Sequence, residues 1–369
     1  MKARVEKVFR HLDPKPDALL VANAVDPHLD QTFFYLFSVP SGLFEGSVAI
    51  AHPDGKLDVL TSPLEAESAH QAAKRDAHVT VHEVGRGDET EKLVKKLVGS
   101  ARALALNYRE ITHEWYSRFA QFLPEAKWSD ASNAIRSARV TKDADEIALL
   151  RKAGEIGSAV GREIPSLLKS GMTELELAAE MEYRMNRLGA GGRSFSTIVA
   201  FGAHGAEPHY QPAATPLRSG DSIVCDFGAI YGRYASDITR SYHFGKRDEE
   251  MQRVHETVEK AQAAALAAVR PGVPGKEIHL AAQRVIDSSP WKGRLIHGVG
   301  HSIGLVVHDG WGYNSTVEDP LEEGMAITVE PGIYLPGHGG VRIEDDIVVT
   351  KNGFDFLTTA PRAYLEVPA

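Results

Sequence analysis

The sequence predicts an α/β protein built in two parts, and three observations support this. Residues 1–135 alternate strand-like and helix-like stretches, which is the pattern of an α/β domain. Residues 136–369 repeat one unit twice, two helices followed by a strand hairpin, and each hairpin carries two acidic residues at strand positions. We therefore expect a small N-terminal domain over 1–135 and a second domain over 136–369.

In the first part, runs rich in β-branched and aliphatic residues predict strands, and runs with helical spacing predict helices. No glycine-rich phosphate loop occurs there, and residue spacing indicates no chemistry. The strand-like runs are 17–23, 46–52, 56–62 and 102–108, and the helix-like runs are 62–75, 90–100 and 114–123.

The second part begins with a long amphipathic stretch that ends at Gly171. Thr173 and Glu176 form a capping box, which predicts a second helix through Leu188. The theme returns with a long helix over 248–270, a break at Pro271-Gly272 and a short helix over 275–288. We interpret the two helix–helix–hairpin units as a pseudo-repeat, with a shared site formed between the halves.

The first hairpin is predicted from strands over 222–230 and 234–243, joined by a tight turn at Tyr231-Gly232. That turn places Asp226 directly opposite Asp237. Two opposed carboxylates repel each other, and a bridging cation would reverse the sign of that interaction. In the second hairpin, centring the turn on Gly337 places Glu330 opposite Glu344 in the same way.

Three histidines, His297, His301 and His308, lie between the two hairpins. The glycines among them disfavour a regular helix, so we expect an irregular or strand-like run. Four acids and one imidazole suit Mn²⁺, Co²⁺, Fe²⁺ or Zn²⁺ rather than Ca²⁺. Such a set can bridge two metals about 3.5 Å apart, which indicates a metal-dependent hydrolase.

Composition excludes several classes of protein. The net charge of −9 argues against a nucleic-acid partner. The single cysteine, Cys225, precludes an intrachain disulfide, favours a cytoplasmic location, and should be a buried thiol on the strand face opposite Asp226. We expect no membrane partner and no signal peptide, because the chain has no apolar run of about 18 residues and no apolar segment near its start.

Four segments, in order, resemble the pita-bread metallopeptidases, a family that includes methionine aminopeptidase, aminopeptidase P and prolidase. The segments are DFGAIYGRYASDITR, HGVGHSIGLVVHD, TVEPGIY and GVRIEDDIVVT, and the resemblance runs from about residue 143 to the end. It implies a pita-bread domain with a pseudo-twofold repeat. FFYLFSVPSG, GSVAIAH and SPLEAESA resemble the creatinase/prolidase N-terminal domain, which favours the proline-specific branch.

The resemblance also implies roles for individual residues. It implies two divalent ions per chain, with manganese favoured and cobalt or zinc open, and a proton shuttle at Glu330. It selects Glu344, rather than Asp345 or Asp346, as the ligand in its segment. The implied metal ligands are Asp226, Asp237, His301, Glu330 and Glu344; the implied catalytic residues are His209, His308 and Glu330; and the implied substrate contacts are His209, His297, His308 and Arg342.

The implied function is hydrolysis of the peptide bond before proline in Xaa-Pro dipeptides by a dimetal-bridging hydroxide, in a homodimer. Four alternatives stay open: an aminopeptidase P acting on longer peptides, a creatinase-like amidinohydrolase, a non-catalytic binding protein and a structural role for the metal. Two departures bear on the substrate. His204 stands where the family often has Asn, and 309–314 contain no Arg of the kind that many prolidases carry there.

Overall fold

The computed structural model describes residues 1–85, 88–246 and 248–368, and the chain divides into two compact units, Met1–Arg139 and Val140–Ala369. The division falls four residues after the predicted boundary (139 against 135). Each unit combines helices with sheets, so the predicted α/β class is confirmed.

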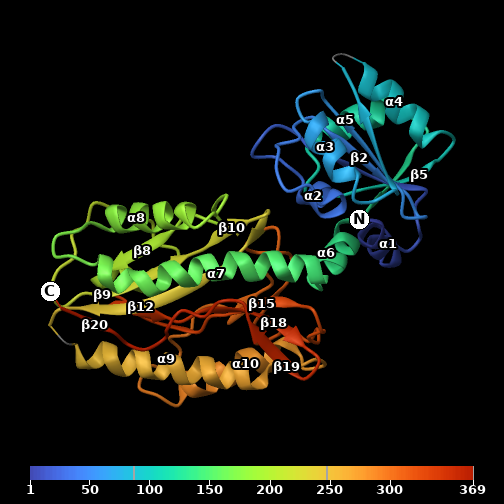
Figure 1. Cartoon of the computed structure of the whole chain (residues 1–369). Coiled ribbons are helices and arrows are strands. Elements are labelled where there is room, and N and C mark those ends of the chain that lie inside the picture. The colour runs from blue at the N-terminus through green and yellow to red at the C-terminus, as the bar shows by residue number, and fades with distance from the viewer. Residues whose placement is uncertain (86–87, 247, 369) are drawn as a thin grey trace. The chain divides into compact units, whose positions relative to one another are not determined.

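Unit 1 contains a six-stranded sheet in the order β4-β3-β2-β1-β5-β6 (Figure 1). The β1–β2 and β2–β3 pairs are antiparallel, and the others are parallel. Its strands are β1 (Ala18–Ala22), β2 (Val48–Ala51), β3 (Leu57–Thr61), β4 (Val79–Glu83), β5 (Ala103–Leu106) and β6 (Lys127–Asp130). Its helices are α1 (Lys2–Arg10), α2 (Gln31–Phe37), α3 (Ala66–Ala73), α4 (Glu89–Val98), α5 (His113–Phe122) and α6 (Ser132–Val140), which reaches the boundary.

All four strands and all three helices predicted for this unit are confirmed. Sequence patterns missed the other elements for identifiable reasons. Helix α2 is buried from Thr32 to Phe37, so it has no polar face to reveal a helical period. Strands β4 and β6 lie at the two edges of the sheet and are polar, so they lack the apolar run of a central strand.

Unit 2 has the predicted pairs of helices. These are α7 (Ala144–Leu167) with α8 (Glu174–Arg187), and α9 (Glu249–Ala268) with α10 (Gly275–Asp287). The capping box at Thr173 and Glu176 is present, and a second box joins Asp143 to Glu146. Figure 1 shows α7 and α8 on one side of the strands and α9 and α10 on the other.

The strands of unit 2 form small sheets between the two pairs of helices. One four-stranded sheet has the order β20-β12-β9-β8, and a three-stranded sheet has the order β15-β18-β19. The strands and the one 3₁₀ helix are β7 (Gly192–Arg193), β8 (Ile198–Phe201), η1 (Gly202–Ala206), β9 (Ser222–Phe227), β10 (Ala229–Tyr231), β11 (Tyr234–Ala235), β12 (Ile238–Phe244), β13 (Gly300–His301), β14 (Gly312–Tyr313), β15 (Ala326–Val329), β16 (Gly332–Leu335), β17 (Gly339–Arg342), β18 (Asp345–Thr350), β19 (Gly353–Phe356) and β20 (Glu366–Val367).

The predicted register of the first hairpin is wrong. Tyr231 pairs with Tyr234, so the turn is Gly232-Arg233, and Asp226 lies opposite Thr239 rather than Asp237. The turn is shifted by one residue, which moves every cross-strand partner by two. Because side chains alternate with a period of two, Asp226 and Asp237 still share one face of the sheet.

The predicted register of the second hairpin is correct. Gly332 pairs with Arg342 and Leu335 with Gly339, which centres the turn on Gly337. The β15–β18 ladder has the same register, also symmetric about Gly337, with Val329 opposite Asp345. Glu330 and Glu344 therefore stand opposite each other in the gap between the two ladders.

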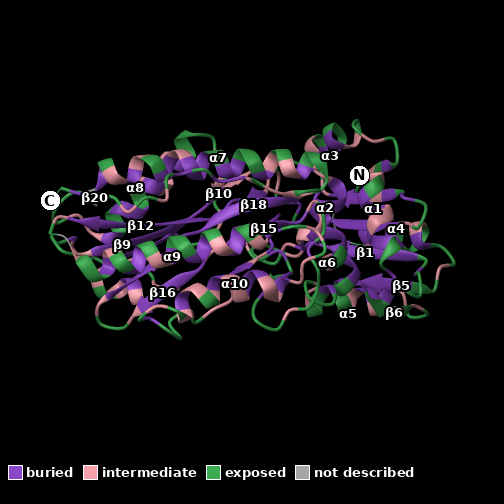
Figure 2. Cartoon of the chain, turned by 90° about the horizontal axis from the view of Figure 1, so that it is seen from below, coloured by how far each residue is buried: buried purple, intermediate pink, exposed green. Residues whose placement is uncertain are grey.

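Each half of unit 2 buries its own apolar core, as a pseudo-repeat requires. One core joins α7 and α8 to β8, β9 and β12, and it includes Cys225, which is buried as predicted. The other joins α9 and α10 to β15–β18. In Figure 2 the strands are buried, while helices such as α7 and α9 alternate buried and exposed faces.

Candidate metal centre

A cavity of about 890 Å³ in unit 2 is lined by every site residue that the sequence indicated. Asp226 lies on β9, Asp237 directly precedes β12, and His301 ends β13. Glu330 follows β15, and Glu344 lies between β17 and β18. His209, His297, His308 and Arg342 line the same cavity. The two hairpins and the histidine run therefore converge on one site.

Three of these side chains form a cluster that could hold a cation. Asp237, His301 and Glu344 each offer a ligand atom, and these atoms lie within 4.8 Å of one another. His301 Nε2 is 3.7 Å from Asp237 Oδ2 and 3.4 Å from Glu330 Oε1. These separations leave space between the ligand atoms that a metal ion can fill.

Three buried carboxylate oxygens in this site accept no hydrogen bond from any part of the chain that the structure describes: Asp226 Oδ1, Asp237 Oδ1 and Glu344 Oε1. A buried acceptor without a donor costs about 1–3 kcal/mol, and more when it is charged. A divalent cation would remove this cost. Hard oxygen donors with one imidazole also form the donor set expected for a metal such as Mn²⁺.

The carboxylates repel one another, and their proton affinities reflect this. Burial raises the pKa of Asp237 well above its usual range, and the charges of Glu344 and Asp226 raise it further. Burial and the nearby Glu330 likewise raise the pKa of Glu344. The pKa of Glu330 is raised to about 7, again mainly by burial. In the metal-free protein the site therefore holds protons near neutral pH, and a cation competes with them.

His301 is prepared to act as a ligand through Nε2. Burial lowers its pKa to about 3, so the ring is neutral and carries one N–H. Its Nδ1 lies 3.2 Å from Ser302 O, which assigns that hydrogen to Nδ1. The Nε2 lone pair is then directed at the carboxylates, as in the usual arrangement of a metal-bound histidine.

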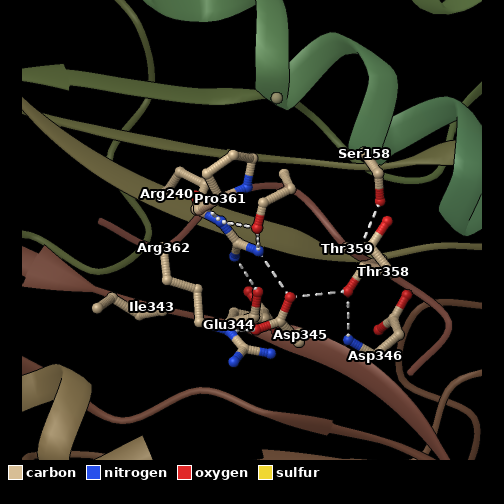
Figure 3. Close-up of polar contacts among 12 residues, drawn as sticks. Ser158, Arg240, Ile343, Glu344, Asp345, Asp346, Thr358, Thr359, Pro361 and Arg362 are labelled. Carbon is tan, nitrogen blue, oxygen red and sulfur yellow. Dashed lines mark hydrogen bonds and ion pairs between the residues drawn. The ribbon is translucent and has the colours of Figure 1, made fainter. Parts of the chain in front are cut away.

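In the acidic run Glu344-Asp345-Asp346 (Figure 3), Glu344 lines the cavity and Asp345 does not. Both carboxylate oxygens of Asp345 accept two hydrogen bonds each from residues that do not line the cavity. Its Oδ1 accepts from Arg240 Nη2 at 2.7 Å and from Thr358 Oγ1 at 3.1 Å. Its Oδ2 accepts from Gln262 and Arg362. Asp345 has no remaining capacity for a metal, whereas Glu344 Oε1 lacks a partner among the described residues.

Arg240 anchors β18, the strand that begins with Asp345 (Figure 3). It is buried on β12, and its guanidinium bonds the neighbouring strand and the C-terminal segment together. Its acceptors, at 2.6–3.2 Å, are Asp345 Oδ1 and the backbone oxygens of Thr239, Glu344, Ala360 and Pro361. Arg240 was not identified from the sequence, although its place in the segment DITRS, three residues after Asp237, was available as a signal.

Arg342 lines the cavity, but its guanidinium N–H groups donate hydrogen bonds to other residues of the protein. Its Nε donates to Thr239 Oγ1 at 3.0 Å, and its Nη1 donates to Tyr334 Oη at 2.9 Å. Its Nη2 forms a buried ion pair with Asp226, and Pro208 O lies 3.5 Å from both terminal nitrogens. Arg342 therefore orients one carboxylate of the site and one loop of its rim.

His297 is held in the same network, through Tyr334. Its Nδ1 lies 2.7 Å from Gly298 O, and burial lowers its pKa to about 4, so it is neutral with the hydrogen on Nδ1. Its Nε2 then accepts from Tyr334 Oη at 2.8 Å. Both nitrogens are engaged, which leaves the ring face for contact in the cavity. Tyr334 was missed at the sequence level; it lies four residues after Glu330 in TVEPGIY.

His308 lies beside the cluster, with its ring centroid 4.2 Å from that of His301. Burial lowers its pKa, and His209 lowers it further. The following residue, Asp309, forms a buried ion pair with Lys142 at 3.2 Å. Ser302 Oγ donates to Asp309 O at 2.6 Å, so the segment that carries His308 is fastened to the segment that carries His301.

Comparison with known proteins agrees with this geometry. Residues 148–351 match the model of metallopeptidase family M24, and residues 14–141 match that of the creatinase/prolidase N-terminal domain. The chain is 32% identical over 366 residues to the Xaa-Pro dipeptidase of Pyrococcus furiosus, an alignment that covers 99% of this chain and 100% of that protein.

Two solved structures are similar over nearly the whole chain. The X-Pro aminopeptidase from Thermotoga maritima MSB8 superimposes with a TM-score of 0.90 at 32% identity, covering 99% of this chain and 100% of that chain. The Xaa-Pro dipeptidase from Bacillus anthracis superimposes with a TM-score of 0.89 at 30% identity, covering 99% of both chains.

Proposed function

The chain belongs to metallopeptidase family M24, and from that membership we propose that it hydrolyses the bond before proline in Xaa-Pro dipeptides. It is a metal-dependent hydrolase of the prolidase type. One observation carries the assignment of the reaction to this cavity. Asp237, His301 and Glu344 gather within 4.8 Å, beside buried carboxylate oxygens that lack a donor among the described residues.

The residues present fit divalent metal. Asp226, Asp237, His301, Glu330 and Glu344 would hold it, with two ions per chain and manganese favoured over cobalt or zinc. When bound, such ions polarise a carbonyl oxygen and lower the pKa of a water from 15.7 to about 7. The oxygens of Asp226, Asp237 and Glu344 that find no donor in the described part of the chain support this assignment.

Glu330 is the proton carrier of the proposal. Its carboxylate reaches the ligand cluster, with Oε1 3.4 Å from His301 Nε2, so it lies within reach of a water held there. Water oxygen attacks the scissile carbonyl carbon, and Glu330 takes the proton that the water loses. The same proton passes to the proline nitrogen as the carbon–nitrogen bond breaks. The first amino acid thus leaves with the water oxygen in its carboxyl group, and proline leaves with the proton on its nitrogen.

His308 and His209 act on the substrate. Neutral His308 donates one N–H to the oxygen that gains charge during attack, and one such donor is typically worth about 2.7–4 kcal/mol. His209, which lines the same cavity, contacts the scissile amide. The nitrogen of an Xaa-Pro bond carries no hydrogen, so recognition of proline relies on ring shape. Apolar lining residues such as Phe195 and Ile296 supply suitable surface.

A second candidate function is removal of the first residue from longer Xaa-Pro peptides. Residues 309–314 contain no Arg to bind a dipeptide's carboxylate, and the hydrogens of Arg342 are engaged within the protein. The solved X-Pro aminopeptidase is as similar in fold as the dipeptidase.

The proposal also includes a homodimer and a cytoplasmic location. The single buried cysteine favours the cytoplasmic location. No helix within the described ranges is long and apolar enough to cross a membrane.

The deciding experiment measures turnover of Gly-Pro and of a Gly-Pro-Xaa tripeptide after treatment with EDTA, and again after Mn²⁺, Co²⁺ or Zn²⁺ is restored. Metal-restored cleavage of the dipeptide supports the prolidase. Preference for the tripeptide supports the second candidate. Cleavage of neither substrate by metal-loaded protein would overturn both, as would full turnover by a metal-free Asp226→Ala variant.

A further inference from the structure

Glu174, a buried carboxylate outside the metal centre, grips the loop that carries His209. Glu174 is the first residue of α8, and its side chain is fully buried. Oε1 accepts from Phe201 N at 2.9 Å and from His204 Nδ1 at 2.8 Å. Oε2 accepts from Tyr210 Oη at 2.9 Å and from Ala213 N at 3.0 Å. Each oxygen thus receives two hydrogens, and the positive end of the helix dipole adds to this stabilisation.

The four donors lie at the two ends of one loop. Phe201 and His204 stand where the loop leaves β8, and Tyr210 and Ala213 stand where it returns towards α8. The residues between the two ends that bond to Glu174 line the cavity: Ala206, Glu207, Pro208 and His209. One carboxylate therefore ties both ends of the segment that faces the substrate.

His204 and Tyr210 also contact each other directly. Their rings stack with centroids 4.4 Å apart and planes 24° apart. Burial and the bond to Glu174 raise the pKa of Tyr210 to about 12, so its hydroxyl remains a donor. The histidine at 204, where Asn is frequent in the family, thus supplies both a hydrogen bond and a stacking surface.

The opposite side of the loop is restrained by the second hairpin. Gly205 packs against Gly340 so closely that a Cβ on Gly340 would overlap Gly205 O. Pro208 O lies 3.5 Å from the terminal nitrogens of Arg342. The loop is therefore held between Glu174 and the hairpin that carries the metal ligands, and His209 lies in the held part.

We propose that Glu174, His204 and Tyr210 are positioning residues that place His209 for substrate binding, without contributing to metal binding. This inference rests on the proposed function for its kinetic consequence. Loosening the loop raises KM and lowers kcat/KM for Xaa-Pro substrates. Metal affinity is unchanged, because none of the three residues lines the metal cluster.

Four variants separate the hydrogen bond from the stacking. His204→Phe retains the ring and loses the donor, whereas His204→Asn retains a donor and loses the ring. His204→Ala loses both, and Tyr210→Phe loses only the hydroxyl. His204 is 35% exposed, so its variants should fold. His70→Ala is the matched control, since His70 pairs with Glu83 at 3.0 Å on the exposed surface of unit 1.

Two readouts are taken for each variant. Backbone amide exchange over residues 201–213 is followed without substrate, and KM, kcat and Mn²⁺ affinity are measured separately. We expect faster exchange and a loss in kcat/KM of roughly ten- to a hundredfold for His204→Ala, His204→Phe and Tyr210→Phe, as for a misplaced substrate contact. His204→Asn should recover most of both, and His70→Ala should match the wild type.

Wild-type exchange and KM in His204→Ala and Tyr210→Phe would overturn the proposal. So would a parallel fall in Mn²⁺ affinity, which would indicate a general structural role. If the wild-type protein cleaves no Xaa-Pro substrate, the proposed function fails instead. The exchange measurement then still decides whether these residues hold the loop.

Discussion

Thr239 donates its hydroxyl hydrogen to Glu344 Oε2 over 2.6 Å, and this bond joins the two acid-bearing hairpins. Thr239 pairs with Asp226 across the first hairpin, and its Oγ1 also accepts from Arg342 Nε at 3.0 Å. The backbone repeats the connection, because Glu344 N donates to Thr239 O at 3.2 Å. A neutral threonine on one hairpin thus orients a carboxylate on the other.

Removing this hydroxyl should weaken metal binding. Thr239→Val keeps the volume of the side chain but leaves Glu344 Oε2 and Arg342 Nε without their partner. Because outer partners of metal ligands typically contribute 10–100-fold in affinity, we expect a loss of about that size. Calorimetric titration of metal-free protein with Mn²⁺ measures it. Thr257→Val is the control, since that hydroxyl donates only to Arg253 O on α9 among the contacts described; equal affinities in both variants would contradict the prediction.

Metal binding should strengthen as pH rises to about 7 and beyond. The pKa of Glu330 is raised from 4.5 to about 7 in the folded protein, so the proton it holds stabilises the metal-free fold below pH 4.5, and this contribution is lost as pH rises through 7. Below about pH 7 a metal ion must displace this proton in order to bind, whereas above that pH the Glu330 carboxylate is already ionised. His301, with a pKa of about 3, stays neutral and adds no slope above pH 5.

The measurement is the rise in Tm on adding Mn²⁺, followed from pH 5.5 to pH 8. We expect this rise to grow with pH in the wild type and to vary less in Glu330→Gln, which lacks one of the protons to displace, while Asp237 and Glu344 keep their raised pKa values. Histidines that titrate in the unfolded chain affect both the metal-free and the metal-loaded protein, so they cancel in the difference. A rise independent of pH in the wild type would contradict the assignment of Glu330.

His308 should affect turnover and leave metal affinity unchanged. His308→Phe keeps an aromatic ring beside His301 but removes the N–H proposed to stabilise the oxyanion. Loss of one such donor typically lowers kcat by about 10²–10³-fold. Steady-state kinetics with saturating Mn²⁺ measure the effect. His338→Phe, which removes a bond to Asp248 at the hairpin turn, serves as the control and should retain activity.

Arg240 should be important for stability. Arg240→Met removes a buried cation that bonds Asp345 and several backbone oxygens, and breaking a buried ion pair costs about 3–5 kcal/mol. Urea denaturation of the metal-free protein, followed by circular dichroism, should show a lower midpoint. Arg362→Met should cost less, because Arg362 is partly exposed and Asp345 keeps Arg240. A wild-type midpoint for Arg240→Met would contradict this account of the anchoring network.

The acidic pairs illustrate how far sequence patterns reach. The register of the second hairpin was counted correctly, because Leu335 pairs with Gly339 and the turn residues between them are centred on Gly337. In the first hairpin the turn uses Gly232 and Arg233, both at positive φ, and Arg at such a position is unusual. The prediction therefore centred the turn one residue too early, yet the period of two kept both acids on one face.

Other features lay outside any local pattern. Arg342 bonds Asp226 across 116 positions, and Arg240 bonds Asp345 across 105. Tyr334 becomes informative only when His297 and Arg342 are seen on either side of its hydroxyl. Glu174 looks like an ordinary acidic residue at a helix start until the loop from β8 is folded onto it.

By itself, the sequence determined the two-part fold, the paired helices and the acids and histidines of the candidate site, because these depend on periodicity, turns and motif spacing within short segments. The tertiary structure alone decided how Arg342 and His297 are hydrogen-bonded, which residues anchor Asp345, and what holds the His209 loop. Those outcomes depend on packing between residues a hundred or more positions apart for Arg342 and Arg240, and about thirty apart for Glu174. Such contacts have no counterpart in the local pattern of the chain.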